Sequence, residues 1–203
     1  MIEQRSSEWF AQRLGCLTAS RMGDMLAKTK TGPSASRVNL LAQLVCERLT
    51  GKPTEQFESA DMRRGTELEP LARDQYEAAT GSIVLPAEFV THPTIPFFGA
   101  SPDGYADEGL VEIKCLNAAN HIAILKGGST EKYIPQVQTQ ALCAGKPWVD
   151  LSFWHPDFPE HLRLKIIRIH AAKEYQQFLA TEAQRFLAEV TVEINELQKL
   201  RAA

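Results

Sequence analysis

Two carboxylates and a lysine lie close together in one stretch of this chain. Asp103 falls in the turn sequence 101–104, and Glu112 and Lys114 stand two residues apart in the apolar run 109–116. A strand has a side-chain period of two, so Glu112 and Lys114 share one face while Ile113 points into the opposite layer. If this strand pairs as a hairpin with the segment that carries Asp103, two carboxylates and one ammonium converge at one sheet end. Such oxygen ligands hold Mg²⁺, and the pattern favours a magnesium-dependent nuclease.

The same residues have a plainer interpretation. Asp-Gly is a common turn dipeptide, and a Glu-x-Lys pair on one strand face is often a solvated ion pair. Against this, Glu112 and Lys114 interrupt an otherwise apolar run, where a charged pair is costly unless it is used. A buried lysine is also a group whose pKa can fall.

Other polar pairs stand at spacings that suit a phosphate or a metal. Glu69, early in an expected helix, is either a third carboxylate or a partner of Arg73 in a surface ion pair. Arg13 and Ser20 flank a turn between two expected helices, where free backbone amides favour an anion, although a capped helix is the commoner outcome. Gln136 and Gln140 share one helix face, as surface residues or as donors to a phosphate or a water.

Length and composition fit one globular domain over residues 1–203. The net charge of −3 argues weakly against a general nucleic-acid binder. No apolar run is long enough to span a bilayer, and the first residues lack the layout of a signal peptide, so we expect a cytoplasmic protein. The four cysteines are far apart without a Cys-x-x-Cys pair, which favours buried free thiols over a zinc site.

The periodicity predicts helices around a central mixed sheet, an α/β or α+β fold. Leu71 and Tyr76 are expected in the core stripe of one helix, and Val38 and Leu49 in that of another. Helices are expected at about 7–14, 19–27, 35–49, 59–79, 118–125, 131–144 and 171–200, and strands at 82–85, 88–92, 97–100, 110–115, 149–154 and 162–170.

Several blocks in this order resemble the lambda exonuclease and YqaJ-type viral recombinase family, a branch of the PD-(D/E)xK nucleases with a restriction-endonuclease-like core. The resemblance covers roughly residues 7–155. The blocks are Trp9, Arg13-Leu14-Gly15, Thr18-Ala19-Ser20, Gly65-Thr66-x-x-Glu69, Ala100-Ser101-Pro102-Asp103-Gly104, Glu112-Ile113-Lys114-Cys115 and Tyr133-x-x-Gln136-Val137-Gln138.

The resemblance implies a Mg²⁺-dependent 5′→3′ exonuclease on double-stranded DNA ends, with Mn²⁺ as a substitute. Such an enzyme releases mononucleotides, leaves 3′ overhangs for a strand-annealing protein, and works as a ring-shaped homotrimer. By position, metal ligands are Asp103, Glu112 and the Ile113 carbonyl, with Glu69 assisting and Lys114 acting on water. The alternatives are a structure- or site-specific endonuclease on the same core and a non-catalytic DNA-end binding protein.

Further roles follow from the matching positions. Arg13, Ser20, Ser101 and Gln136 correspond to the pocket for the terminal 5′-phosphate, with Gln138, Gln140, Arg63 and Arg64 in support. One departure is Pro93, where the family has a further acid.

Met62 is an apolar residue at the amino end of an expected helix, beside two arginines. We expect it to wedge between the last base pairs and splay the 5′ strand, because apolar wedges unstack base steps. The family has an apolar residue at the matching position. The alternative is a hydrophobic staple that packs on Thr66 or Leu68.

Overall fold

The computed structural model describes residues 4–54 and 59–200. Its largest sheet has five strands in the order β10-β9-β8-β7-β4, with β8 and β9 parallel and the other neighbours antiparallel. A smaller sheet has the order β1-β6-β5, and β2 and β3 form a separate hairpin. The strands are β1 (Leu17–Thr18), β2 (Lys28–Thr29), β3 (Gly32–Pro33), β4 (Val84–Leu85), β5 (Val90–Thr91), β6 (Phe98–Ala100), β7 (Gly104–Ala106), β8 (Gly109–Cys115), β9 (Trp148–Trp154) and β10 (Leu164–His170).

Helix ends follow local sequence signals. The hydroxyls of Ser6, Ser34 and Ser59 accept N-cap hydrogen bonds, and Gly51 and Gly81 end their helices in the left-handed conformation. The helices are α1 (Ser7–Arg13), α2 (Met22–Leu26), α3 (Ala35–Thr50), α4 (Ala60–Thr80), α5 (Ala118–Leu125), α6 (Ile134–Ala144), α7 (Glu160–Arg163) and α8 (Lys173–Lys199), with 3-10 turns η1 (Ala19–Arg21) and η2 (Glu131–Tyr133).

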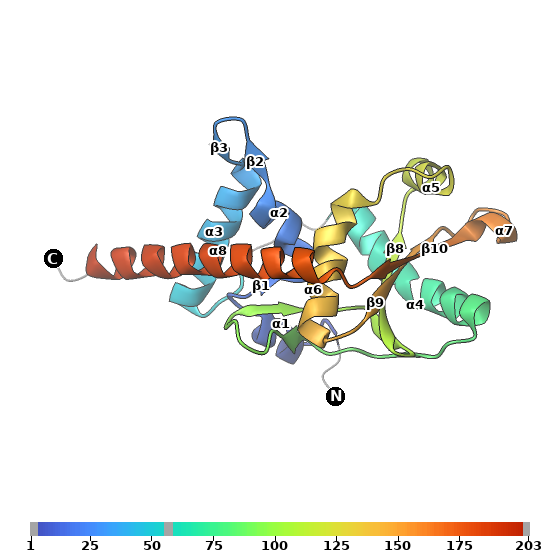
Figure 1. Cartoon of the computed structure of the whole chain (residues 1–203), viewed down its shortest axis with the longest axis horizontal. Coiled ribbons are helices and arrows are strands. Elements are labelled where there is room, and N and C mark those ends of the chain that lie inside the picture. Colours follow the sequence, from blue (N-terminus) through green and yellow to red (C-terminus); the bar gives the residue numbers. More distant parts are fainter. Residues whose placement is uncertain (1–3, 55–58, 201–203) are drawn as a thin grey trace.

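Helices cover both faces of the five-stranded sheet (Figure 1). On one face, α4 packs through Ala72 and Tyr76 against β8 residues such as Val111. On the other face, α6 packs through Val137 against residues of β8 and β9 that include Leu151. The sheet is therefore a middle layer, and the strand that carries Glu112 and Lys114 is at its centre.

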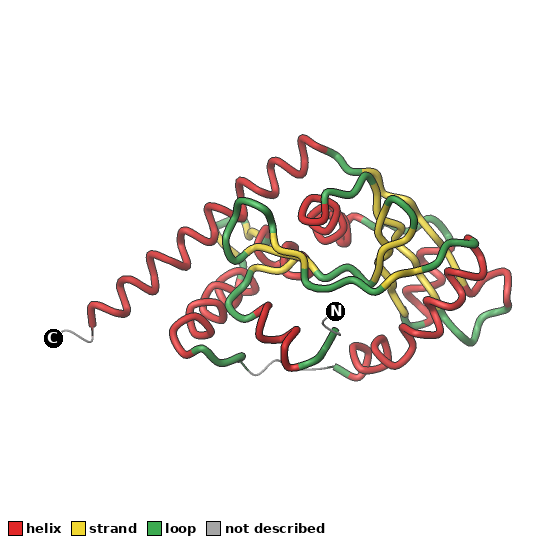
Figure 2. The backbone as a smooth tube through the Cα atoms, turned by 90° about the horizontal axis from the view of Figure 1, so that it is seen from below, coloured by secondary structure: helices red, strands yellow, loops and turns green. Residues whose placement is uncertain are grey.

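A second core joins the smaller sheet to helices α2, α3, α6 and α8. Leu17 of β1 and Phe98 of β6 pack with residues of α2, α3 and α8, among them Leu44 and Phe186. The tube view shows α8 running across this part of the molecule and on toward the carboxy terminus (Figure 2). Because β6 leads directly into the turn before β7, the second core anchors the segment that carries Asp103.

Several expectations about elements were wrong. The predicted central mixed sheet is present as the five-stranded sheet, but β5 and β6, which were expected in it, form a smaller sheet with β1. The strands β1, β2, β3 and β7 were not expected. The strand expected from residue 162 begins at Leu164, because α7 occupies the residues before it. Leu71, Val38 and Leu49 are 53%, 54% and 42% exposed, since each lies at the margin of its helix's apolar stripe.

The cysteines also differ from the expectation. All four are free thiols, but only Cys143 is buried, whereas Cys46 is exposed and Cys16 and Cys115 are half-buried. In the described part of the chain, no helix is both long enough and apolar enough to cross a membrane.

Candidate active site

The hairpin of β7 and β8 brings Asp103 beside the strand of Glu112, as the sequence predicted. Asp103 immediately precedes β7, and its backbone N–H donates to the Val111 carbonyl at 3.1 Å. Its Oδ2 accepts from the Ile113 N–H at 2.6 Å, which fixes the carboxyl against β8. The turn and the strand therefore fix the position of Asp103 relative to Glu112.

Glu112 is buried and receives hydrogen bonds on both oxygens. Oε1 accepts from Lys114 Nζ at 2.6 Å and from Gln136 Nε2 at 2.6 Å. Oε2 accepts from Gln140 Nε2 at 2.5 Å, while Gln136 Oε1 also accepts from Lys114 Nζ at 3.3 Å. Both glutamines lie on α6, so the face predicted from their spacing is directed at the carboxylate. They orient Glu112 rather than lying on the surface.

Glu69 is held beside this group by two arginines. Arg73 donates to Glu69 Oε1 at 3.3 Å and to the Asp103 carbonyl at 3.0 Å, and so links α4 to the turn before β7. Arg5 donates to Glu69 Oε2 at 3.4 Å. The ion pair of Glu69 with Arg73 is thus present, as one of the two interpretations expected. The additional bond from Arg73 to Asp103 was not foreseen, because sequence spacing cannot show a contact 30 residues away.

The site carries more negative than positive charge. Burial, and then the charges of Glu112 and Glu69, raise the pKa of Asp103 well above its usual range, with Lys114 and the Ile113 N–H opposing. Burial alone would lower the pKa of Lys114, but Glu112 and Asp103 outweigh it and raise that pKa. The lowered pKa that burial of a lysine allows is therefore not seen in this arrangement.

The oxygen atoms of this site are chemically suited to bind a hard divalent cation. Carboxylates and a main-chain carbonyl are the ligands that Mg²⁺ prefers, and a cation would relieve the repulsion around Asp103. Within the described residues, no three His, Cys, Asp or Glu side chains are gathered closely enough to hold a metal ion as they stand. To bind the cation, Glu112 would give up the hydrogen bond that it accepts from Lys114.

Arg13 contacts Ser101, which lies in the turn that leads to Asp103. Its Nη1 donates to Ser101 Oγ at 2.6 Å, and its guanidinium stacks over Trp9 at 4.0 Å from the ring centroid. Burial lowers the pKa of Arg13 to about 10, so it stays cationic at neutral pH. Ser20 is exposed and hydrogen-bonded to Thr18 at 3.2 Å. The structure therefore pairs Arg13 with Ser101, and Ser20 lies in η1, directly after the strand that pairs with β6.

The remaining predicted residues lie in different places. Met62 is 56% exposed at the start of α4. Arg64 donates to the Leu116 carbonyl at 3.1 Å, and the neighbouring Arg63 is exposed. Gln138 is not directed at the carboxylates, because its amide bonds His170 and Ala172 at the junction of β10 and α8. Pro93 is exposed in the loop between β5 and β6.

Comparison with known proteins identifies the family. The sequence model of the YqaJ-like viral recombinase domain matches residues 8–147. The chain belongs to the YqaJ-like viral recombinase family. The match spans every predicted site residue, from Arg13 to Gln140.

Solved structures of similar proteins agree with the assignment of this chain to the YqaJ-like family. An alkaline exonuclease from Laribacter hongkongensis, LHK-Exo, is 43% identical, with a TM-score of 0.89 and coverage of 97% of this chain and 98% of that one. The same enzyme in complex with dAMP is 44% identical, with the same TM-score and coverage. A phage-related exonuclease from Haemophilus somnus, at 13% identity and TM-score 0.69 over 88% of this chain and 96% of that one, shares the fold. No curated protein sequence matches.

Proposed function

We propose that this protein is a Mg²⁺-dependent 5′→3′ exonuclease that degrades one strand of linear double-stranded DNA from its ends. It releases 5′-mononucleotides and leaves 3′ single-stranded overhangs, on which a strand-annealing protein acts in recombination. The observation that carries the proposal is the adjacency of two groups: Ser101, bonded to Arg13, is two residues from Asp103, which lies beside Glu112. The alkaline exonuclease with 43% identity supports the same reaction class.

Each part of the site has a role in phosphodiester hydrolysis. Mg²⁺, when bound by Asp103, Glu112 and the Ile113 carbonyl with help from Glu69, would supply Lewis-acid stabilisation and an activated water. Lys114 Nζ, released from Glu112, faces the charge that develops on the non-bridging oxygens. Gln136 and Gln140 would keep the Glu112 carboxylate oriented toward the bound cation.

The terminal phosphate needs its own binding site, since an enzyme that removes one nucleotide at a time must measure from the end. Arg13 supplies a guanidinium that is already fixed by Ser101 and Trp9, and guanidinium–phosphate bonds are strong and directional. Ser20, Ser101 and Gln136 complete the proposed phosphate pocket. Met62, exposed at the start of α4, is the proposed wedge.

Digestion of matched linear and closed-circular duplexes tests this function. With Mg²⁺ or Mn²⁺, we expect mononucleotides from linear DNA alone, early loss of a 5′ label and late loss of a 3′ label. Cutting of the circle would instead indicate an endonuclease. Binding to ends without metal-dependent hydrolysis would indicate a non-catalytic protein.

The Arg13→Ala variant tests the phosphate pocket. A charged hydrogen bond is worth about 1.5–3 kcal/mol, so digestion of 5′-phosphorylated ends should fall roughly ten- to a hundredfold. Ends with a 5′-hydroxyl should lose much less, because they offer no such anion. Equal losses on both substrates would remove Arg13 from the pocket.

We further propose a homotrimer that encircles the duplex in the cytoplasm and stays on its substrate by topology. Light scattering should give about three times the 22.6 kDa chain mass. A monomeric mass with full activity would contradict the ring.

A further inference from the structure

A cavity of about 300 Å³ lies beside the proposed phosphate pocket. Arg13 and Ser20 line it, whereas Asp103, Glu112 and Lys114 do not. Arg13 lines the cavity and also donates to Ser101, two residues before Asp103, so it links the cavity to the segment that carries the carboxylate. The cavity is then on the 5′ side of a phosphate held at Arg13. The volume is at the lower end of the range for small-ligand sites, which suits one nucleotide. Besides Arg13 and Ser20, the polar lining includes Arg21, Thr18, Gln43, Glu47 and Thr54.

The wall formed by α3 is already organised. Glu47 Oε1 accepts from Gln43 Nε2 and from the Thr54 hydroxyl, both at 2.9 Å, and its Oε2 accepts from the Gly15 N–H at 2.9 Å. Arg21 Nη1 donates to Gln43 Oε1 at 3.1 Å, and Arg21 Nε to Asp24 at 2.8 Å. Because both oxygens of Glu47 have donors, its carboxylate closes the wall and is not directed at a ligand. The cavity is therefore preformed.

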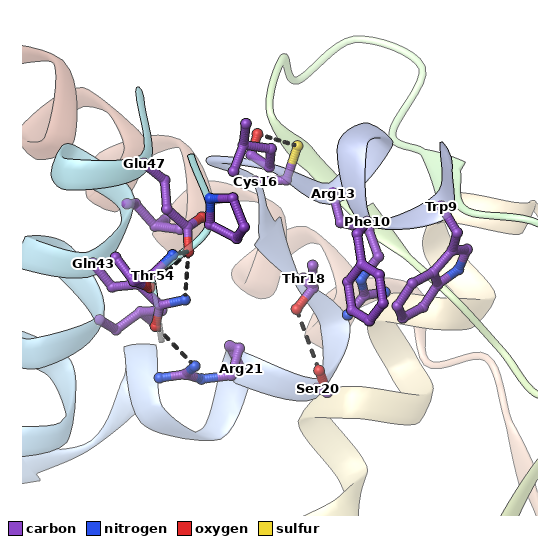
Figure 3. A pocket seen from close by; sticks show the side chains of 14 residues that line it. Trp9, Phe10, Arg13, Cys16, Thr18, Ser20, Arg21, Gln43, Glu47 and Thr54 are labelled. Atoms are coloured by element: carbon purple, nitrogen blue, oxygen red, sulfur yellow. Dashed lines mark hydrogen bonds between the residues drawn. The ribbon is translucent and has the colours of Figure 1, made fainter. Parts of the chain in front are cut away.

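The opposite wall belongs to α1 (Figure 3). Phe10 and Arg13 are three residues apart, so they share a helix face at about 5–6 Å between their Cβ atoms. The Phe10 side chain is 54% exposed although its neighbour Trp9 is buried against it at 5.0 Å between ring centroids. One face of α1 thus presents an exposed aromatic ring for a base and, one turn away, a cation for the attached phosphate. Bases stack on such rings without regard to sequence.

We propose that this cavity accepts one unpaired nucleotide on the 5′ side of the phosphate that Arg13 binds, with its base on Phe10. The inference rests on the proposed exonuclease function. A duplex end with a one-nucleotide 5′ overhang would then bind with its first internucleotide phosphate, not its terminal phosphate, at Arg13. Water would attack the next phosphodiester: the P–O3′ bond breaks, the released dinucleotide keeps a 3′-hydroxyl, and the shortened strand keeps the 5′-phosphate.

The first product of single-turnover digestion shows whether the terminal phosphate or the first internucleotide phosphate is bound at Arg13. We expect a blunt 5′-phosphorylated duplex to release a mononucleotide, and the one-nucleotide overhang to release a 5′-phosphorylated dinucleotide. A two-nucleotide overhang should react more slowly, because the cavity holds one nucleotide. If the overhang is removed as a mononucleotide, the cavity is not used and the proposal is wrong. If the blunt end is not digested either, the exonuclease function itself fails.

The base contact is tested by Phe10→Ala with Phe178→Ala as a matched control. Phe178 is an exposed phenylalanine of α8, 47% exposed, and does not line the cavity. The rate of dinucleotide release, relative to the blunt-end rate, should fall about tenfold in Phe10→Ala, as expected for one lost stacking contact. The ratio should not change in Phe178→Ala. An abasic nucleotide in the overhang should lower the ratio of dinucleotide release to blunt-end digestion in the wild type. In Phe10→Ala it should cause no further loss. An unchanged ratio in Phe10→Ala, or equal losses in both variants, would overturn the assignment.

Discussion

The Asp103 carboxyl is surrounded by more negative than positive charge. Burial, and then the charges of Glu112 and Glu69, raise its pKa, and only Lys114 and one backbone N–H oppose them. Its ionised form therefore destabilises the folded chain when no cation is bound. Functional sites commonly hold groups whose pKa values are shifted in this way.

Asp103→Asn should separate activity from stability. Hydrolysis should fall at least about a hundredfold, since a proposed metal ligand is lost. The melting temperature without metal should rise, by about 2–4 °C for each 1 kcal/mol of relieved repulsion. The amide can keep the bond from Ile113. Retained activity, or a clear fall in melting temperature, would show that Asp103 is structural.

Gln140 and Gln138 lie two residues apart on α6 and have different partners. Gln140 donates to Glu112, whereas Gln138 bonds the backbone at the junction of β10 and α8. Gln140→Met should lower the rate per folded molecule roughly ten- to a hundredfold, as losses of groups behind metal ligands do.

Gln138→Met is the matched control for that experiment. It should lower the melting temperature, because buried backbone groups lose their partner, while the rate per folded molecule stays near that of the wild type. If both variants lose activity in proportion to stability, Gln140 has no separate role in orienting Glu112.

At the scale of elements, a buried polar network fixes α4 on the sheet. Asp150 of β9 is buried and accepts from the Tyr76 hydroxyl at 2.7 Å and from Arg168 through two bonds of 2.8 Å. Arg168 also stacks over Trp148 at 3.6 Å from the ring centroid. Tyr76 lies two turns after Glu69 on the same helix, so this network also sets where Glu69 meets the sheet.

Tyr76→Phe should destabilise the chain, because it removes a hydrogen bond to a buried charged acceptor. Such a bond is worth about 1.5–3 kcal/mol, which corresponds to a drop of roughly 3–12 °C in melting temperature. Tyr175→Phe is the control: no described residue is a hydrogen-bond partner of its hydroxyl. Thermal unfolding of both variants measures the difference. An unchanged melting temperature in Tyr76→Phe would show that the network contributes nothing to stability.

Local patterns predicted the parts of the site that lie on one element. The period of β8 placed Glu112 and Lys114 on one face, and the helical period placed Gln136 and Gln140 together. Contacts between distant elements were not predictable in this way. The second sheet, the bond from Arg73 to Asp103 and the network of Asp150 all depend on tertiary packing. The role of Gln138 came from the resemblance alone, and its bonds to the backbone of His170 and Ala172 could not be read from the helical period.

At the scale of the whole molecule, two buried histidines join segments at one end of the sheet. His121 of α5 donates through Nε2 to the Leu162 carbonyl at 2.8 Å. His155, just after β9, has its ring centroid 5.8 Å from that of His121, and both contact Phe158. Burial lowers the pKa of His155, and the charge of Arg64 adds to the effect. Protonation of His155 therefore opposes folding.

The stability of the fold should therefore depend on pH through His155. Below a pH of about 6.5 the unfolded chain protonates His155 while the folded chain does not, so the free energy of unfolding falls as the medium becomes more acidic. Denaturant titrations at about pH 7.5 and about pH 5.5 should show this loss, and His155→Gln should reduce it. His161→Gln changes an exposed histidine and should leave the difference as in the wild type. If His155→Gln keeps the full difference, the acid sensitivity of the fold originates at other groups.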